Sequence, residues 1–201
     1  MNLNPFANWK APGAANAVPG EGQKVNPAAP FAAAYWIAWA LLQVGTREIV
    51  GPRHSPVIMG WIRELGAKAL GIQVNDDETP WCGTFAAMVM KMARLSIPAI
   101  AVRASQWGRA GNWGRELLAP RPGCIMVFTR NGGGHVGFYM GETRTHFRIL
   151  GGNQSNSVSE TWIAKDRLAE GGMRWPKGVP LPAAHRIHLK SDGKPASTNE
   201  A

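Results

Sequence analysis

Cysteine is scarce in this sequence of 201 residues, which contains only Cys82 and Cys124. Two cysteines do not indicate a disulfide scaffold, and neither belongs to a CxxC pair or to a Cys/His cluster with zinc spacing. Long apolar segments are lacking too, since the run from Phe31 to Leu42 is well short of the roughly 20 residues that span a membrane. These absences argue against a disulfide-rich, zinc-binding or membrane-spanning protein, and they leave a cysteine available for catalysis.

Acidic residues are also few, because 13 Asp and Glu stand against 22 Lys and Arg and give a net charge of +9. The resulting positive electrostatic potential attracts polyanions such as nucleic acid or the anionic polymers of a bacterial surface. The basic residues are scattered and form no dense run of the kind that marks a nucleic-acid-binding arm. We therefore expect an anionic cell envelope, and no specific nucleic acid, as the partner of this charge, and we expect a monomer.

Composition divides the chain into three parts. Residues 1–30 are rich in Ala, Pro, Gly and Asn with few bulky apolar side chains, which predicts a flexible leader. Residues 31–190 carry the patterning of one folded domain, and residues 191–201 are polar and predicted to form a disordered tail. Residues 1–10 lack the charged start and apolar core of a secretory signal, so we expect synthesis in a host cytoplasm and delivery to the cell wall by a holin, a virion or a secretion device.

The patterning within the folded domain predicts helices first and strands afterwards. Apolar residues recur at helical spacing in three segments, at residues 31–42 before Gly45, 57–65 before Gly66, and 81–93. Short apolar runs separated by Gly-rich turns predict strands at residues 124–128, 135–140 and 146–150. This order predicts an α+β domain in which N-terminal helices pack on a small antiparallel β-sheet.

Cys82 is predicted at the start of the third helix, after a turn-forming loop at residues 75–80. A helix N-terminus lowers the pKa of a thiol, because the macrodipole and the free backbone N–H groups stabilise the thiolate. A free cysteine is more often a small buried core residue, so position alone leaves both roles open. For Cys124, inside an apolar strand, we expect the core role.

His135 opens a predicted strand directly after three glycines, which leave room around its ring. A thiol and an imidazole so far apart in sequence meet only in the folded chain. A third group is then needed to orient the imidazole, and a hairpin partner of the His135 strand would place Asn153 beside the ring. Each residue also has a purely structural interpretation. His135 would then be a hydrogen-bonded histidine at the end of a strand, and Asn153 would belong to an ordinary Gly-Gly-Asn turn.

Taken together, these motifs resemble the NlpC and CHAP superfamily. The resemblance rests on Trp81-Cys82 after an acidic loop, on Gly134-His135-Val136-Gly137, and on Gly151-Gly152-Asn153-Gln154. The last motif is similar to the GGNQ run of a phage-associated branch of the superfamily. With weaker upstream matches, the resemblance covers about residues 33–165.

The resemblance implies a papain-like NlpC/CHAP fold and a catalytic domain at residues 31–190. The expected function is endolysin-like cleavage of an amide or peptide bond in peptidoglycan, with no metal or organic cofactor. It implies that Cys82 is the nucleophile, His135 the general base and Asn153 the orienting residue.

The chain departs from the family pattern at the residue that orients the imidazole. Many CHAP proteins have Glu two positions before the Asn, and this chain has Gly151 there, so Gln154 is a further candidate for the role. Glu78 and Trp81, close to the nucleophile in sequence, are accessory candidates.

Other functions remain open from the sequence. A binding module with an inert thiol would hold wall polymer or another polyanion through its basic surface. A zinc hydrolase would combine His135 with His185 and His188, although no acidic partner or third ligand stands near that pair in sequence. Within the same fold, a secreted antibacterial toxin amidase fits the residues as well as an endolysin-like enzyme does.

Overall fold

The computed structural model describes residues 31–183 and 186–190, so the expected leader at 1–30 and the expected tail at 191–201 lie outside the described residues. The helices are α1 (Trp36–Leu41), α2 (Pro56–Leu70) and α3 (Cys82–Met92), followed by the 3₁₀ segments η2 (Ala104–Trp107) and η3 (Arg109–Gly111). The strands are β1 (Arg115–Glu116), β2 (Ile125–Arg130), β3 (Gly133–Glu142), β4 (His146–Gly151), β5 (Ser159–Ala164) and β6 (Leu168–Trp175), with η4 (Lys165–Arg167) between the last two.

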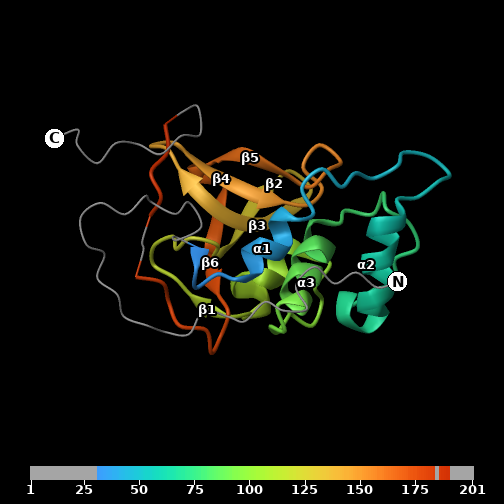
Figure 1. Cartoon of the computed structure of the whole chain (residues 1–201), viewed down its shortest axis with the longest axis horizontal. Helices are drawn as coiled ribbons and strands as arrows, with labels where there is room; N and C mark the ends of the chain where they lie inside the picture. The colour runs from blue at the N-terminus through green and yellow to red at the C-terminus, as the bar shows by residue number, and fades with distance from the viewer. Residues whose placement is uncertain (1–30, 184–185, 191–201) are drawn as a thin grey trace.

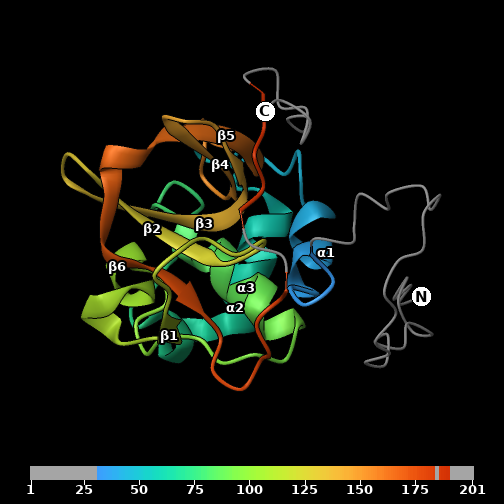
Figure 2. The same cartoon turned by 90° about the vertical axis from the view of Figure 1, so that its left-hand side faces the viewer.

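The strands form one six-stranded antiparallel sheet in the order β1-β6-β2-β3-β4-β5. Figures 1 and 2 show the three helices gathered on one side of this curved sheet. Helices followed by an antiparallel sheet confirm the α+β arrangement that the sequence predicted. None of the helices in the described ranges is long and apolar enough to cross a membrane.

The predicted meander is present as β2, β3 and β4, in which Phe128 lies opposite His135 and Phe138 lies opposite Leu150. The sequence patterning missed the other three strands. β1 is only 2 residues long, and β6 contains Gly171 and Gly172, which disfavour an extended strand. β5 and β6 are formed through pairing with their neighbours β4 and β2, which a local pattern does not reveal.

Helix bounds were predicted well for α3 and for the first part of α2, and less well for α1. α1 ends at Leu41, because the chain then turns and the Gly45 N–H donates to the Val158 carbonyl. The first helical segment of α2 stops at Gly66, as predicted, because the backbone there is non-helical (φ 70°, ψ 166°) and forms a kink. A second segment follows and ends at Gly71, whose left-handed conformation (φ 82°) is typical of a C-cap.

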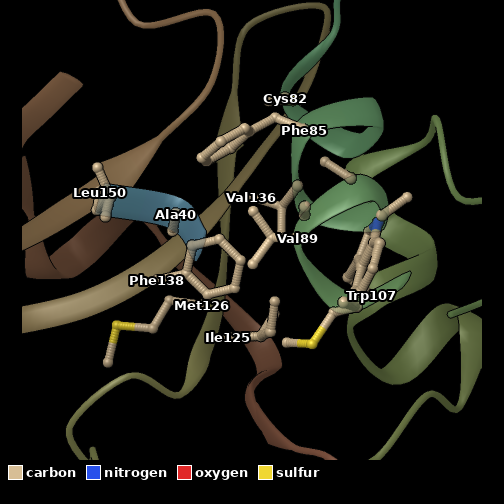
Figure 3. Close-up of a cluster of buried hydrophobic side chains, with 14 of the residues drawn as sticks. Ala40, Cys82, Phe85, Val89, Trp107, Ile125, Met126, Val136, Phe138 and Leu150 are labelled. Atoms are coloured by element: carbon tan, nitrogen blue, oxygen red, sulfur yellow. The ribbon is translucent and has the colours of Figure 1, made fainter. Parts of the chain in front are cut away.

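α3 lies at the centre of the core, between α2 and the sheet. Phe85 of α3 contacts Trp61 of α2 and Phe138 of β3, with ring centroids 5.8 and 6.0 Å away. Figure 3 shows Phe85 and Val89 of α3 facing Val136 and Phe138 of β3. Burial of apolar side chains on both sides of α3 fixes its position, and with it the place where the helix begins.

A buried carboxylate organises the loops in front of α3. Asp77 is fully buried and accepts hydrogen bonds from the backbone N–H groups of Ile49 and Ser55 at 2.9 and 2.8 Å, and its Oδ1 lies 2.9 Å from His54 Nδ1. Burial by itself would raise the pKa of Asp77, but the hydrogen bonds outweigh burial and lower it. The charged carboxylate therefore connects the loop at 49–55 to the segment that leads into Cys82.

Replacing this carboxylate should weaken the fold. We expect Asp77→Asn to lower the free energy of unfolding by about 2 to 4 kcal/mol at pH 7, because an amide cannot accept all of these bonds and faces backbone donors with its own NH₂. Urea denaturation followed by tryptophan fluorescence measures the change. The matched control is Asp76→Asn, because the carbonyl oxygen of the new asparagine can still accept the Thr79 N–H. We expect this variant to lower the free energy of unfolding by less than about 1 kcal/mol.

The pH dependence provides a second readout of the same interaction. Because the folded-state pKa of Asp77 is lowered, its contribution to stability is present above the unfolded pKa of about 3.9 and is lost as the pH falls below that value. Asp77→Asn should therefore differ most from the wild-type protein at neutral pH. Equal stability of the two proteins at pH 7 would contradict this account.

Candidate functional site

Cys82 is the first residue of α3 and is buried, with 4% of its surface exposed. The next residue shows why the helix starts here, because a Cβ atom on Gly83 would lie only 2.3 Å from the carbonyl oxygens of Ala101 and Val102. Only glycine permits this approach, which holds the beginning of α3 against the segment that leads into η2. Figure 3 shows Cys82 at the end of α3, above the apolar cluster.

The resting state of Cys82 differs from the expectation based on the helix terminus. Burial raises the pKa of the Cys82 thiol, and this effect exceeds the opposing influence of the Val136 N–H, the Arg130 charge and the N–H groups of Gly83 and Cys82. The expected lowering of the pKa was therefore wrong in its net direction, because the helix terminus lies inside the protein and not at its surface. The Val136 N–H that lowers the pKa of the thiol belongs to β3, and Val136 directly follows His135 on that strand.

His135 lies on β3 and is also buried, with 6% of its surface exposed. Burial lowers the pKa of its imidazole to about 4, and the charges of Arg130 and Arg167 act in the same direction. The glycine before it permits close packing, since a Cβ on Gly134 would meet the Phe128 carbonyl oxygen at 3.2 Å and the Ala104 side chain at 3.3 Å. His135 is therefore neutral at pH 7.

Gln154 is the residue that contacts the His135 ring, with its Oε1 atom 3.0 Å from Nε2 of the imidazole. The amide is oriented from its other end, because Gln154 Nε2 donates to the carbonyl oxygens of Ile149, at 3.3 Å, and Ser159. Both amide hydrogens are thereby used, and the oxygen must face the histidine. Nε2 of His135 is consequently the nitrogen that carries the hydrogen, and Nδ1 has a free lone pair.

Asn153 does not take the place that the sequence suggested for it beside the ring. Its backbone is left-handed (φ 54°), and its side chain makes no hydrogen bond with any residue in the described ranges. The turn that contains it sits directly on α3, since a Cβ on Gly152 would lie 2.6 Å from Phe85 Cβ and 2.7 Å from the Trp81 ring. This close contact brings Gln154, the residue after Asn153, to the imidazole.

Gly151 explains why a glutamine three residues beyond the end of β4 can reach the histidine. A Cβ on Gly151 would point at the same atoms, 3.0 Å from both His135 Nε2 and Gln154 Oε1. The Gly151 position therefore faces the imidazole. Here the position has no side chain, and the Gln154 amide fills the space.

The two accessory candidates make structural contacts. The Trp81 indole is buried and donates to the Glu48 carboxylate at 3.0 Å, and Glu78 accepts the Gly51 N–H at 2.9 Å. Both side chains connect the loop at 48–51 to the segment before α3, and neither lines the cleft described next. Cys124 is fully buried, and burial raises its pKa to about 12, as suits a core residue.

A cleft of about 650 Å³ opens beside the thiol. Its walls are Thr79, Pro80 and Cys82 at the start of α3, the β2–β3 turn, the segment from Val102 to Ala110, and Ala169 with Glu170. Sequence reasoning did not find this cleft or the arginines that line it, because its walls come from segments far apart in the chain. Cys82 belongs to the wall of this cleft, although only 4% of its surface is exposed.

The zinc alternative cannot be assembled from the described residues. No group of three or more His, Cys, Asp or Glu side chains in those ranges is arranged to hold a metal ion. His185 lies outside the described residues, and His188 forms an isolated bridge with Glu142 through its backbone.

A buried thiol at the start of a helix, beside a strand that carries an oriented imidazole, provides the two groups that cysteine hydrolases use. Residues 74–153 match the family model described as the CHAP domain. This range contains Cys82, His135 and Asn153 and ends one residue before Gln154. The match supports the CHAP/NlpC superfamily, and CHAP domains are generally cysteine- and histidine-dependent amidases or peptidases. A search of curated proteins found no match to the chain.

The contact between His135 and Gln154 leads to a prediction about titration. In Gln154→Glu a carboxylate would replace the amide oxygen at Nε2 and favour the charged imidazole, so we expect the pKa of His135 to rise from about 4 by at least one unit. An NMR pH titration of the imidazole Cε1–H signal, assigned with His135→Gln, measures the change.

Asn153→Asp is the matched control, because it introduces the same charge one residue away without the contact. We expect a clearly smaller shift in this variant. A larger shift in Asn153→Asp than in Gln154→Glu would show that Asn153 is the partner of the imidazole in solution.

Proposed function

We propose that this chain is a peptidoglycan hydrolase that cleaves an amide or peptide bond of murein, with Cys82 as nucleophile, His135 as general base and Gln154 as the residue that orients the base. The observation that carries the proposal is the His135 imidazole on β3, which Gln154 orients and which stands one residue before Val136, whose N–H favours the Cys82 thiolate. The CHAP match supports the substrate class.

The tautomer of His135 assigns the proton path. Because Gln154 accepts the hydrogen on Nε2, the free lone pair on Nδ1 is the one that receives the Cys82 proton. Proton transfer then creates a thiolate whose charge is favoured by the Val136 N–H and by Arg130. Gln154 thus acts as a positioning residue, while Cys82 and His135 perform the chemistry.

The reaction then follows the sequence of a thiol hydrolase. The sulfur forms a bond to the carbonyl carbon, and the Cys82 backbone N–H helps to hold the tetrahedral oxyanion. The C–N bond breaks as His135 gives its proton to the leaving amine. Water, deprotonated by His135, attacks the thioester, releases the carboxylic acid and restores the Cys82 thiol with the same proton.

The resting enzyme keeps both catalytic groups neutral. The pKa of Cys82 is raised and that of His135 is lowered, both chiefly by burial, so a thiolate–imidazolium pair is not the ground state at pH 7. The proton therefore moves when the substrate is attacked. Activation of the thiol therefore depends on the orientation of the His135 imidazole, which Gln154 determines.

For the biological role we propose an endolysin-like lytic enzyme of a papain-like type, held near an anionic envelope by its net charge of +9. An antibacterial toxin with the same chemistry would show the same residues and the same products.

The proposal is tested by the release of soluble fragments from purified peptidoglycan. Cys82→Ala should reduce the rate by at least about a thousandfold, since it removes the attacking atom. Cys124→Ala is the matched control, because the same change at the other thiol should leave the wall-lysing rate close to wild type. Mass spectrometry of the fragments identifies the bond that is cut, and EDTA should not slow the reaction.

A Cys82→Ala variant as active as the wild-type protein would overturn the proposal. Binding to the wall without any fragment release, in the wild-type protein, would favour the inert binding module.

A further inference from the structure

The cleft beside the nucleophile carries positive charge that its own residues do not neutralise. Its charged lining consists of Arg103, Arg109, Arg130 and Glu170. Arg109 is neutralised within the protein, since its guanidinium pairs with Glu170 and, at 3.1 Å, with Glu116. The remaining charge of the cleft therefore belongs to two arginines.

Arg103 and Arg130 are exposed, and neither forms an ion pair with a carboxylate in the part of the chain that the structure describes. Their guanidinium groups make no hydrogen bond to those residues either. A guanidinium presents several N–H donors in a rigid plane and is always charged at physiological pH. Two such groups in one cleft are available to an anionic ligand.

Arg130 lies closest to the chemistry. It ends β2, and a Cβ on Gly133 would lie 4.0 Å from Arg130 Nε, so the side chain rests against the glycine turn before His135. Arg130 pairs with Gly133 across the β2–β3 turn and lines the same cleft as Cys82. A ligand held by Arg130 would therefore lie in the cleft that contains the nucleophile.

Arg103 stands on a different element that reaches the same turn. It directly precedes η2, and this segment touches the β2–β3 turn where Ala104 meets Gly134. Gly132, Gly133 and Gly134 line the same cleft and present backbone without side chains. The cleft therefore combines two unpaired positive charges with backbone that a substrate can approach closely.

We propose that Arg103 and Arg130 form a carboxylate-binding subsite, which selects murein peptides with a free carboxylate close to the scissile bond. The inference rests on the proposed function and refines its substrate class. A carboxylate matches the planar donor arrangement of a guanidinium and would neutralise the charge beside the catalytic pair. Within a murein stem peptide the carboxylate comes from the isoglutamyl unit or from the peptide terminus.

The test uses synthetic muropeptides that differ in a single group. One set carries the isoglutamyl carboxylate either free or as a carboxamide, and the other set carries the terminal carboxylate either free or as a carboxamide. We expect kcat/KM of the wild-type protein to fall about tenfold or more on amidation in one of the two sets. That set identifies which carboxylate is bound.

The variants Arg130→Gln and Arg103→Gln should bring the ratio of the free-acid to the amide rate towards one. Arg144→Gln is the matched control, since it removes the same charge from an exposed residue between β3 and β4, outside the cleft. This control should keep the wild-type ratio.

Binding provides a readout that does not depend on turnover. Calorimetry with Cys82→Ala should show tighter binding of the free acid than of the amide in the same set, and this difference should vanish when Arg130→Gln is added. Equal affinities for the free acid and the amide would overturn the subsite. So would a ratio of free-acid to amide rate that falls as much in Arg144→Gln as in Arg130→Gln. An active wild-type enzyme without carboxylate preference would overturn only the subsite, whereas activity that persists in Cys82→Ala would overturn the proposed function itself.

Discussion

The burial of α3 between α2 and the sheet is the constraint on which the rest of the structure depends. Phe85 contacts aromatic rings on both sides, and two glycines permit backbone contacts that any side chain would prevent. Gly83 holds the helix start against residues 101 and 102, and Gly152 brings the turn after β4 onto Phe85 and Trp81. Packing thus determines where the thiol and the group that orients the imidazole are placed.

The same burial determines the electrostatics of the site. A helix start at the surface would have favoured the Cys82 thiolate, but desolvation outweighs the helix terminus and raises the thiol pKa. Desolvation also lowers the pKa of His135, so the two groups are neutral together at rest. Arg103 and Arg130 supply positive charge in the cleft that Cys82 also lines.

The contact with the His135 imidazole is made by a residue outside the strand that faces the ring. The strand position that faces the imidazole is Gly151, and the Gln154 side chain reaches the space that a longer side chain there would fill. Left-handed backbone at Asn153, Ser155 and Asn156 makes the tight turn that permits this reach. The sequence motif predicted that Asn153 would lie beside the ring, whereas the contact in the structure is made by Gln154, because spacing along the chain does not reveal which side chain a turn directs at the ring.

The sequence by itself determined the class of the fold, the helix that begins at Cys82, the β2–β4 meander and the candidate pair Cys82 and His135. These follow from hydrophobic periodicity, from glycine and proline positions and from motif resemblance, all of which are local. Only the tertiary structure decided the edge strands, the neutral resting state of the pair, the contact made by Gln154 and the arginine-lined cleft. Each of these depends on burial or on contacts between distant segments, which exist only when the chain has folded.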